Sequence, residues 1–462
     1  MTDSASEWAT QQWAAAELGD IRRTARAVAI GARMAAAPEA TLPTQMRASS
    51  ELKGAYRLLN NPDITLAQLL APHCDATRVA AGRTQLTLLV QDTTELDYTA
   101  HANIIRGLGP IGNGGGQGLL LHSTLAVVPA TGQVLGLADA RVVLRQPIDK
   151  PRDKSRRSPE ARLWDDAAEQ VGRPPPAATW MHVCDRGADD FDLMAACRRQ
   201  GAHFLIRARH NRRLQWPAAT LASPPPHRLL DYARSLPLHP GSQYQVEVAA
   251  TFKHPARQAD VVLSWASVTF APPSNASPPI ADEDSFTVWI VRAWEVQPPP
   301  GVEPLEWILL TSWPIQDLDE ARFIIQCYTR RWLVEDFHQC LKTGCQVEDS
   351  QLDDRADLER LLGFALPIAA RLLQLRQDAR NTPEMLATTA VEPLIVKVLL
   401  RLRPRLKPNI SVAEFWAQVA RLGGHPGRRR DGPPGWRTIW RGWRYLSDLA
   451  DGARLFVPDG GD

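Results

Sequence analysis

The sequence of 462 residues has no long apolar segment, few cysteines and almost no excess of charge of either sign. Its longest apolar runs, such as residues 119–130, fall short of the roughly 20 residues that a membrane-spanning helix needs. The first residues lack a basic start followed by an apolar stretch, so we expect no signal peptide. A membrane protein is therefore not predicted, and we expect a cytoplasmic location.

The six cysteines form no CxxC pair, and no histidine stands at zinc-finger spacing from them. This absence argues against a structural zinc site and favours reduced, buried thiols. Lys and Arg total 53 and Asp and Glu total 51, which leaves a formal net charge of +2. A surface that binds nucleic acid would therefore have to be local.

What the chain does contain is an ordinary globular composition, with 44% hydrophobic and 23% charged residues. This composition excludes a long disordered or fibrous protein, and the length suggests about two to four domains. Proline (37 residues) and tryptophan (15 residues) are frequent. The prolines indicate many loops, and some of the tryptophans are expected on contact surfaces.

Residues 1–70 are expected to be helical, with a breaker at residues 18–20 and a stop at the Asn-Asn-Pro-Asp segment 60–63. This part carries several basic side chains, among them Arg22, Arg23 and Arg26. Their charges fit either a solvated helix face or a small DNA-binding helical module.

Residues 85–209 have the pattern of an α/β sheet, in which strand-like segments are followed by helix-like ones. Strands are expected at residues 86–90, 121–128, 134–144, 179–184 and 203–209, and helices at 159–171 and 190–199. The glycine-rich segment 112–118 is not followed by Lys-Ser or Lys-Thr, so it is not a phosphate-binding P-loop.

Residues 212–312 are rich in proline and contain four strand-like runs, which predict a mostly antiparallel β insertion. The runs cover residues 244–252, 261–270, 286–294 and 305–310. The helical pattern then returns, with helices expected over 318–342 and over 358–375, the second kinked at Pro367. The C-terminal part is also expected to be helical, with a break at residues 423–434.

Three acidic residues stand where a catalytic site is expected. Asp92 and Asp185 each follow a predicted strand, and the carboxyl ends of parallel strands are where sites form in an open sheet. Glu335 lies on the predicted helix 318–342. Carboxylates without His or Cys favour Mg²⁺ or Mn²⁺, and paired ions of this kind support in-line displacement at phosphorus. Taken singly, each acid also fits a turn or a helix surface.

The residues around Glu335 make this set more specific. Segment 328–342, YTRRWLVEDFHQCLK, fits the pattern Y-x2-R-x3-E-x6-K, with Tyr328, Arg331 and Lys342 beside the acid. The pattern resembles the YREK signature of the insertion-sequence-four family of bacterial DDE transposases, in particular its Tn-five type. Other similar segments extend the resemblance from about residue 7 to residue 380, namely 18–26, 54–57, 61–62, 91–94, 184–189, 306–312, 358–360 and 370–376.

The resemblance implies a ribonuclease H-like catalytic core interrupted by a β insertion. It implies a DNA-end-binding domain at residues 1–70, a core at 71–380 with the insertion at 212–312, and a dimerising helical region at 381–462. Asp92, Asp185 and Glu335 would bind two Mg²⁺ ions, with Mn²⁺ as a substitute. The enzyme would nick DNA at the inverted-repeat ends, form and open a hairpin, and join the 3′-hydroxyl ends to target DNA. It would act as a homodimer on paired ends and be associated with the nucleoid when bound to DNA.

The resemblance also implies contacts to DNA near the acids. Arg331 and Lys342 would neutralise phosphates and Tyr328 would bond to one, although a salt-bridged helix surface also explains these residues. Trp307 would stack on a flipped base, and the alternative is a core tryptophan. Arg207 matches a basic position near the site, with a solvated loop as the alternative.

The chain departs from the Tn-five type at a few positions. Gln339 stands where that member has a lysine, and Gly187 stands where it has an acid. The Arg- and Trp-rich stretch 427–444 does not match it and fits either DNA-backbone contact or a packed helix with a basic face.

A cut-and-paste transposase is the function we predict, and two rivals stay open. One is an inactive DNA-binding regulator, against which the complete set of acids argues. The other is a metal-dependent nuclease that only hydrolyses DNA, against which the head region and Trp307 argue.

Overall fold

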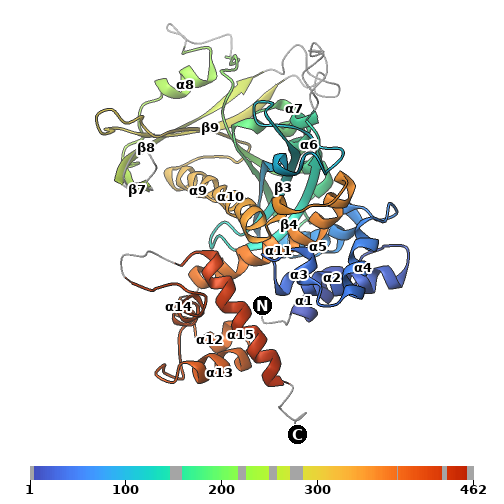
Figure 1. Cartoon of the computed structure of the whole chain (residues 1–462). Coiled ribbons are helices and arrows are strands. Elements are labelled where there is room, and N and C mark those ends of the chain that lie inside the picture. Colours follow the sequence, from blue (N-terminus) through green and yellow to red (C-terminus); the bar gives the residue numbers. More distant parts are fainter. Residues whose placement is uncertain are drawn as a thin grey trace.

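A computed structural model describes residues 5–145, 159–216, 225–248, 257–270, 285–381, 383–428 and 434–454, and the statements below concern this part of the chain. Figure 1 shows N-terminal helices, a central sheet flanked by helices, and a separate group of C-terminal helices. This mixed α/β architecture confirms the predicted fold class, with a core consistent with the ribonuclease H-like arrangement.

The N-terminal region is helical, as predicted. Its helices are α1 (Ala5–Trp13), α2 (Ile21–Ala36), α3 (Leu42–Gln45), α4 (Ser49–Leu59) and α5 (Leu66–Gly82). Asp20 caps α2, and Thr65 begins α5 with a reciprocal capping box. Trp13 packs against Gly31 of α2, where an added Cβ would lie 2.2 Å from the ring. Helix α5 continues past residue 70, where we expected the region to end.

The central feature is one ten-stranded sheet in the order β2-β3-β1-β5-β6-β10-β9-β8-β7, with β4 paired to β3. The pairs β1–β5 and β5–β6 are parallel, and the other pairs are antiparallel. The strands are β1 (Leu86–Asp97), β2 (Gly109–Ile111), β3 (Gly116–Val127), β4 (Val134–Val143), β5 (Thr179–Cys184), β6 (His203–Arg207), β7 (Tyr244–Val248), β8 (Arg257–Phe270), β9 (Phe286–Glu295) and β10 (Glu306–Thr311).

Alternating residues of the strands give the sheet two apolar faces. Leu88 and Val90 of β1 belong to a large core that includes residues of the N-terminal helices, of α11 (Arg355–Asn381) and of the C-terminal helices. Leu89 belongs to the other face, where α6 (Pro159–Val171) packs. Helix α7 (Phe191–Gln200) packs with the insertion strands in a third cluster. The sheet is therefore covered on both sides.

The expected β insertion is present and antiparallel, but it is not a separate unit. Strand β10 pairs with β6 of the core, so β7–β10 extend the same sheet. The insertion also contains a short helix, α8 (Leu229–Ser235), that the sequence pattern did not predict. In Figure 1 this helix lies above β8 and β9.

The helix expected over residues 318–342 is interrupted. Helix α9 (Leu318–Thr329) ends before Arg330, and α10 (Trp332–Gln339) continues into a π-helical turn at Cys340–Gly344. The long helix α11 runs from Arg355 to Asn381 with Pro367 inside it, and its buried leucines join the large core. Both residues between the two helices, Arg330 and Arg331, keep right-handed helical backbone angles, so the interruption is short.

The C-terminal helices are α12 (Ala387–Ala390), α13 (Pro393–Leu402), α14 (Val412–Leu422) and α15 (Trp436–Arg454). Helices α14 and α15 cross closely, because a Cβ at Gly442 would lie 1.7 Å from the Val419 carbonyl oxygen. Trp440 and Trp443 are buried, so these two rings follow the packed-helix alternative. Arg444 pairs with Glu39 at 2.8 Å, which ties α15 to the N-terminal region.

The described residues also bear on the predictions for the cysteines and for membrane-spanning helices. Five of the six cysteines are buried and all are free thiols, as predicted. No helix within the described ranges is both long and apolar enough to cross a membrane. Residues 429–433 of the Arg- and Trp-rich stretch lie outside the described residues.

Candidate active site

Asp92 and Asp185 lie at the same edge of the sheet. The last parallel pair between β1 and β5 joins Val90 to Val183, and each aspartate stands two residues beyond it. Asp185 directly follows the end of β5, as expected, and its Oδ1 accepts the Gly187 N–H at 2.7 Å. Asp92, however, does not end its strand, because β1 continues to Asp97 along β3. The parallel pairing, rather than the strand end, is what aligns the two acids.

Glu335 reaches this edge from α10, which packs against β1 and β3. Arg331 lies between the helix and the strand. Its Nη2 is 2.7 Å from Glu335 Oε1 and its Nη1 is 3.6 Å from Asp92 Oδ2. The Arg331 side chain is only 11% exposed. The guanidinium therefore joins the acid of the strand to the acid of the helix.

The pKa of the Asp92 carboxyl is raised to about 6. Burial is the main cause, because it disfavours the charged form. The negative charges of Asp185 and Glu335 raise it further, while the Thr93 N–H and Arg331 act in the opposite direction. The three acids are thus close enough to interact electrostatically, which is typical of a functional site.

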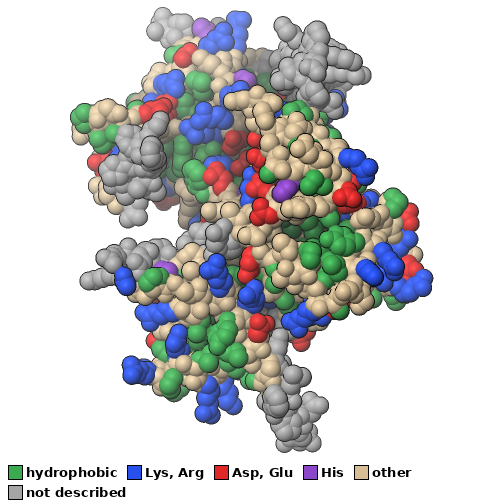
Figure 2. Space-filling view, in the orientation of Figure 1, with side chains coloured by type: hydrophobic (Ala, Val, Ile, Leu, Met, Phe, Trp, Pro, Cys, Tyr) green, Lys and Arg blue, Asp and Glu red, His purple; other side chains and the backbone are tan. Residues whose placement is uncertain are grey.

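The three acids do not form a compact metal-binding group in this structure. Within the described ranges, no group of three or more His, Cys, Asp or Glu side chains is arranged to hold a metal ion. Arg331 stands between Asp92 and Glu335. The three side chains are nevertheless chemically suited to bind a hard divalent cation, since such ions prefer carboxylate oxygens as ligands. In Figure 2, acidic side chains gather near the middle of the face shown, with basic ones beside them.

Two aromatic side chains and one basic side chain lie beside Asp185, and we call them the wall: Trp307, Tyr328 and Arg207. Tyr328 is 3% exposed, and the ring of Trp307 packs edge-on against it at 5.1 Å between centroids. Arg207 Nη2 donates to the Glu306 carbonyl oxygen at 3.0 Å. Trp307 and Arg207 are partly exposed, whereas Tyr328 lies beneath the surface. In this structure Tyr328 supports Trp307 and does not reach out towards a phosphate.

Lys342 lies farther along β1 from Asp92. Its Nζ donates to the carbonyl oxygen of Glu95 and pairs with Glu348 at 3.4 Å. Glu348 in turn accepts the Asp97 N–H at 2.9 Å. These contacts fix Lys342 beside the end of β1. A phosphate would have to compete with Glu348 for its charge.

Sequence reasoning missed two residues of this region. Trp332 follows Arg331, is 55% exposed and lies 4.8 Å from the Arg331 guanidinium. His338 is buried, and its Nε2 lies 3.3 Å from Ser123 Oγ, opposite Asp92 in the β1–β3 register. Both lie inside the YREK segment, but the spacing of the motif does not distinguish an exposed ring from a packed one.

A buried polar chain runs on the other face of β1. Thr93 Oγ1 lies 2.8 Å from His122 Nδ1, and His122 Nε2 lies 3.2 Å from Gln91 Oε1. Gln91 Nε2 then lies 2.7 Å from His182 Nδ1, and His182 Nε2 has no partner among the described residues. An amide nitrogen only donates, so His182 Nδ1 must accept. This contact requires the His182 imidazole to be neutral, and the Gln91 amide oxygen requires His122 Nε2 to donate.

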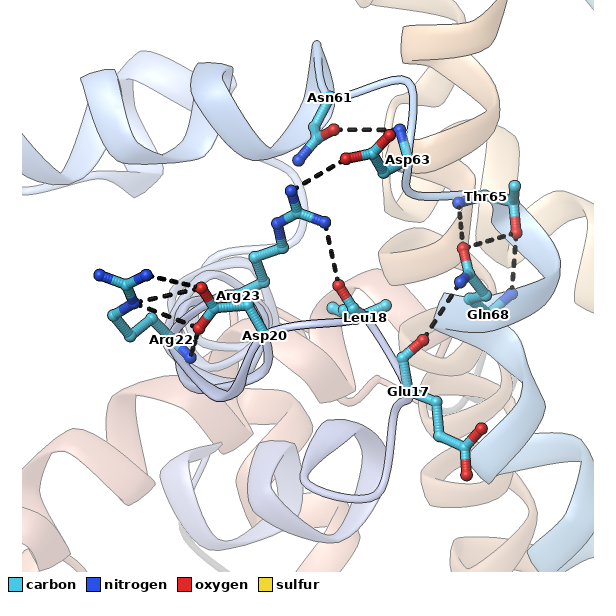
Figure 3. A network of polar contacts seen from close by, with 9 residues as sticks. All are labelled: Glu17, Leu18, Asp20, Arg22, Arg23, Asn61, Asp63, Thr65 and Gln68. Carbon is cyan, nitrogen blue, oxygen red and sulfur yellow. Dashed lines mark hydrogen bonds and ion pairs between the residues drawn. The ribbon is translucent and has the colours of Figure 1, made fainter.

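The three head arginines that we predicted as DNA contacts lie away from the acids, on α2, and differ in their surroundings. Arg22 pairs with its neighbour Asp20 at 2.8 Å and remains 86% exposed. Arg23 bonds to Asp63 at 3.0 Å and to the Leu18 carbonyl oxygen, so it fastens the start of α2 to the turn before α5 (Figure 3). Arg26 is exposed and forms no hydrogen bond or ion pair with the described residues.

Two comparisons with known families bear on this arrangement. Residues 5–64 match the transposase DNA-binding family, and residues 156–371 match the transposase DDE domain. The first match covers the helices α1–α4 with the three arginines. The second covers Asp185, Glu335 and the whole wall beside them. Asp92 precedes the matched range, so its place in the site depends on its register with Asp185.

Proposed function

We propose that this chain, a DDE transposase by its DNA-binding and DDE domains, moves DNA by a cut-and-paste route. The observation that carries the proposal is the common sheet edge of Asp92 and Asp185, towards which α10 presents Glu335. The acids would hold two divalent cations, with Mg²⁺ as the expected ion and Mn²⁺ as a substitute. When bound, such ions supply an activated hydroxyl oxygen and stabilise charge on the phosphate.

Arg331 has a clear role in this proposal. A DNA phosphate offers the Arg331 guanidinium a bidentate partner, which could replace its two separate contacts with Asp92 and Glu335. Transfer of Arg331 to the phosphate would free Asp92 and Glu335, which it joins in this structure. Engagement of DNA would therefore complete the acidic site, and the free protein would be protected from cleaving DNA without correct alignment.

The aromatic side chains suit the hairpin step that we propose. Forming a hairpin requires a nucleotide to leave the stack, and stacking on an aromatic ring is worth about 1–3 kcal/mol per base. Trp307 stands beside the acids on a strand, and Trp332 presents an exposed ring next to Arg331. We propose that these two rings hold the unstacked nucleotide.

The head domain and the oligomeric state complete the proposal. The exposed side chains of Arg22 and Arg26 on α2 would contact the backbone of the inverted-repeat ends. Two protomers would pair two ends, with the C-terminal helices as the dimer contact. The same DNA-bound protein would then join the 3′-hydroxyl ends to target DNA.

An excision assay tests this function. The DNA ends that flank the gene are placed around a marker, and purified protein is added with Mg²⁺ or Mn²⁺ beside an Asp185→Asn control. Metal-dependent release through a hairpin intermediate, absent in the control, is the expected result. Binding of the ends without cleavage would favour the inactive regulator, and cleavage without strand joining would favour a hydrolytic nuclease.

A further inference from the structure

Asp189 lies four residues after Asp185 and has no place in the proposed chemistry, yet its side chain is completely buried. Its Oδ1 forms an ion pair with Arg212 Nη1 at 2.5 Å, and the Arg212 side chain is 8% exposed. The Arg212 guanidinium also lies over the rings of Phe191 and Phe270, at 4.9 and 5.6 Å from their centroids. A buried pair of this kind is expensive to desolvate and needs a full set of partners.

Those partners come from the loop that follows β6. Asp189 Oδ2 accepts the backbone N–H groups of Arg209 and His210 at 2.7 and 2.8 Å. Arg212 Nη2 donates back to the Asp189 carbonyl oxygen at 2.8 Å. One carboxylate therefore binds three groups of the β6 loop, and it belongs to the turn that begins with Asp185. The loops after the two parallel strands β5 and β6 are fastened to each other.

The fastened loops carry basic side chains directed towards solvent. Arg186 is exposed after β5, and Arg209 and His210 are exposed after β6. Arg207 is half-buried between them, close enough to feel the charges of both Arg186 and Asp185. Like charges on two loops repel each other, so the loops need an internal anchor. Because Asp189 binds the backbone of Arg209 and His210, their side chains remain available to an external anion.

We infer that Asp189 and Arg212 are positioning residues, which hold the Arg209–His210 tip beside Asp185 as a binding element for DNA phosphates. This inference rests on the proposed transposase function and extends its DNA contacts to a second loop. Asp189 acts only through this tip. Without the Asp189–Arg212 pair, the Arg209–His210 tip would no longer be held in one position. The phosphate contacts next to the acids would then be lost, while the head domain would still bind DNA.

The salt dependence of DNA binding measures these contacts. The variant D189N/R212Q removes both buried charges together, so that no unpaired charge is left in the interior. Its matched control is E295Q/R257Q, which neutralises the buried pair between Glu295 and Arg257 in the insertion. Each protein is titrated with a fluorescently labelled short DNA duplex over a range of KCl concentrations without divalent metal. R209A/H210A and the combination of both double variants complete the series.

We expect D189N/R212Q and R209A/H210A to lower the slope of log Kd against log salt by a similar amount, about 1–2, because each lost phosphate contact changes it by about 0.9. The combined variant should show no further loss, and the control should keep the parent slope. An unchanged slope in D189N/R212Q, or an additive loss in the combined variant, would overturn the positioning function. Metal-dependent excision by the parent is measured in parallel, and its absence would count against the transposase function instead.

Discussion

The buried histidines beside the candidate site should make the protein sensitive to mild acid. The pKa of His182 is lowered to about 3, because its ring is fully buried. Protonation would also place a second donor on Nδ1, directly opposite the Gln91 amide nitrogen at 2.7 Å. The folded protein therefore keeps His182 neutral, whereas an unfolded chain takes up the proton near its ordinary pKa of about 6.5.

The sign and size of the effect follow from this difference. Below about pH 6.5 the unfolded state binds more protons than the folded state, so stability is present above that pH and is lost as pH falls towards 3. For one histidine with these pKa values the loss between pH 7 and pH 5 is ~2 kcal/mol of unfolding free energy. His73, His122 and His338 are also buried with lowered pKa values and should contribute in the same direction.

Urea unfolding at pH 7 and pH 5, followed by tryptophan fluorescence, tests this reasoning. In His182→Gln the glutamine oxygen can still accept from Gln91 but cannot be protonated in this range. The difference in unfolding free energy between the two pH values should therefore shrink by ~2 kcal/mol relative to the parent. His227→Gln is the matched control, because His227 is exposed, and it should leave the difference unchanged. Equal differences in the parent and in His182→Gln would refute the argument.

Three further predictions concern residues that lie at contacts between helices. Trp13→Ala should lower the unfolding free energy by about 3–5 kcal/mol in urea titrations, because the ring is fully buried against Gly31. Gly442→Ala should accelerate hydrogen exchange in α14 and α15 selectively, since its Cβ would collide with a carbonyl oxygen of α14; unchanged exchange would contradict the close crossing. Arg360→Met should cost about 3–5 kcal/mol and expose the N-terminal helices to proteases, because Arg360 donates to Leu59 and Ile64 and pairs with the buried Asp357.

Much of the fold could be predicted, because its strands contain strongly apolar runs. The strand at residues 179–184 was predicted to the residue, and the insertion and its antiparallel character were also foreseen. The position of Asp92 within its strand was wrong, because a pairing with β3 continues β1 after the pairing with β5 stops. Sequence periodicity reports on burial and does not reveal which neighbour a strand has.

The candidate site could be predicted only in part. The transposase family was identified correctly at the level of its DNA-binding and DDE domains, whereas the metal ions, the hairpin and the dimer stay predictions. The break between α9 and α10 was not foreseen, because no glycine or proline marks it. Nor could spacing reveal that Tyr328 is buried while Trp332 is exposed, since both lie on the same motif. Such differences depend on packing against segments distant in the sequence.

The insertion also determines where the sheet is vulnerable. A strand with unpaired backbone groups is a template for unwanted pairing with another chain. Without β10, the edge strand of the sheet on this side would be β6, the immediate neighbour of β5, which Asp185 follows. Because the insertion adds four strands, β7 at the far end of the sheet is the edge strand instead. The strands that carry Asp92 and precede Asp185 are thus hydrogen-bonded on both sides. Substitutions in the edge strand β7 that prevent pairing with another chain would therefore not disturb the strands that position these acids.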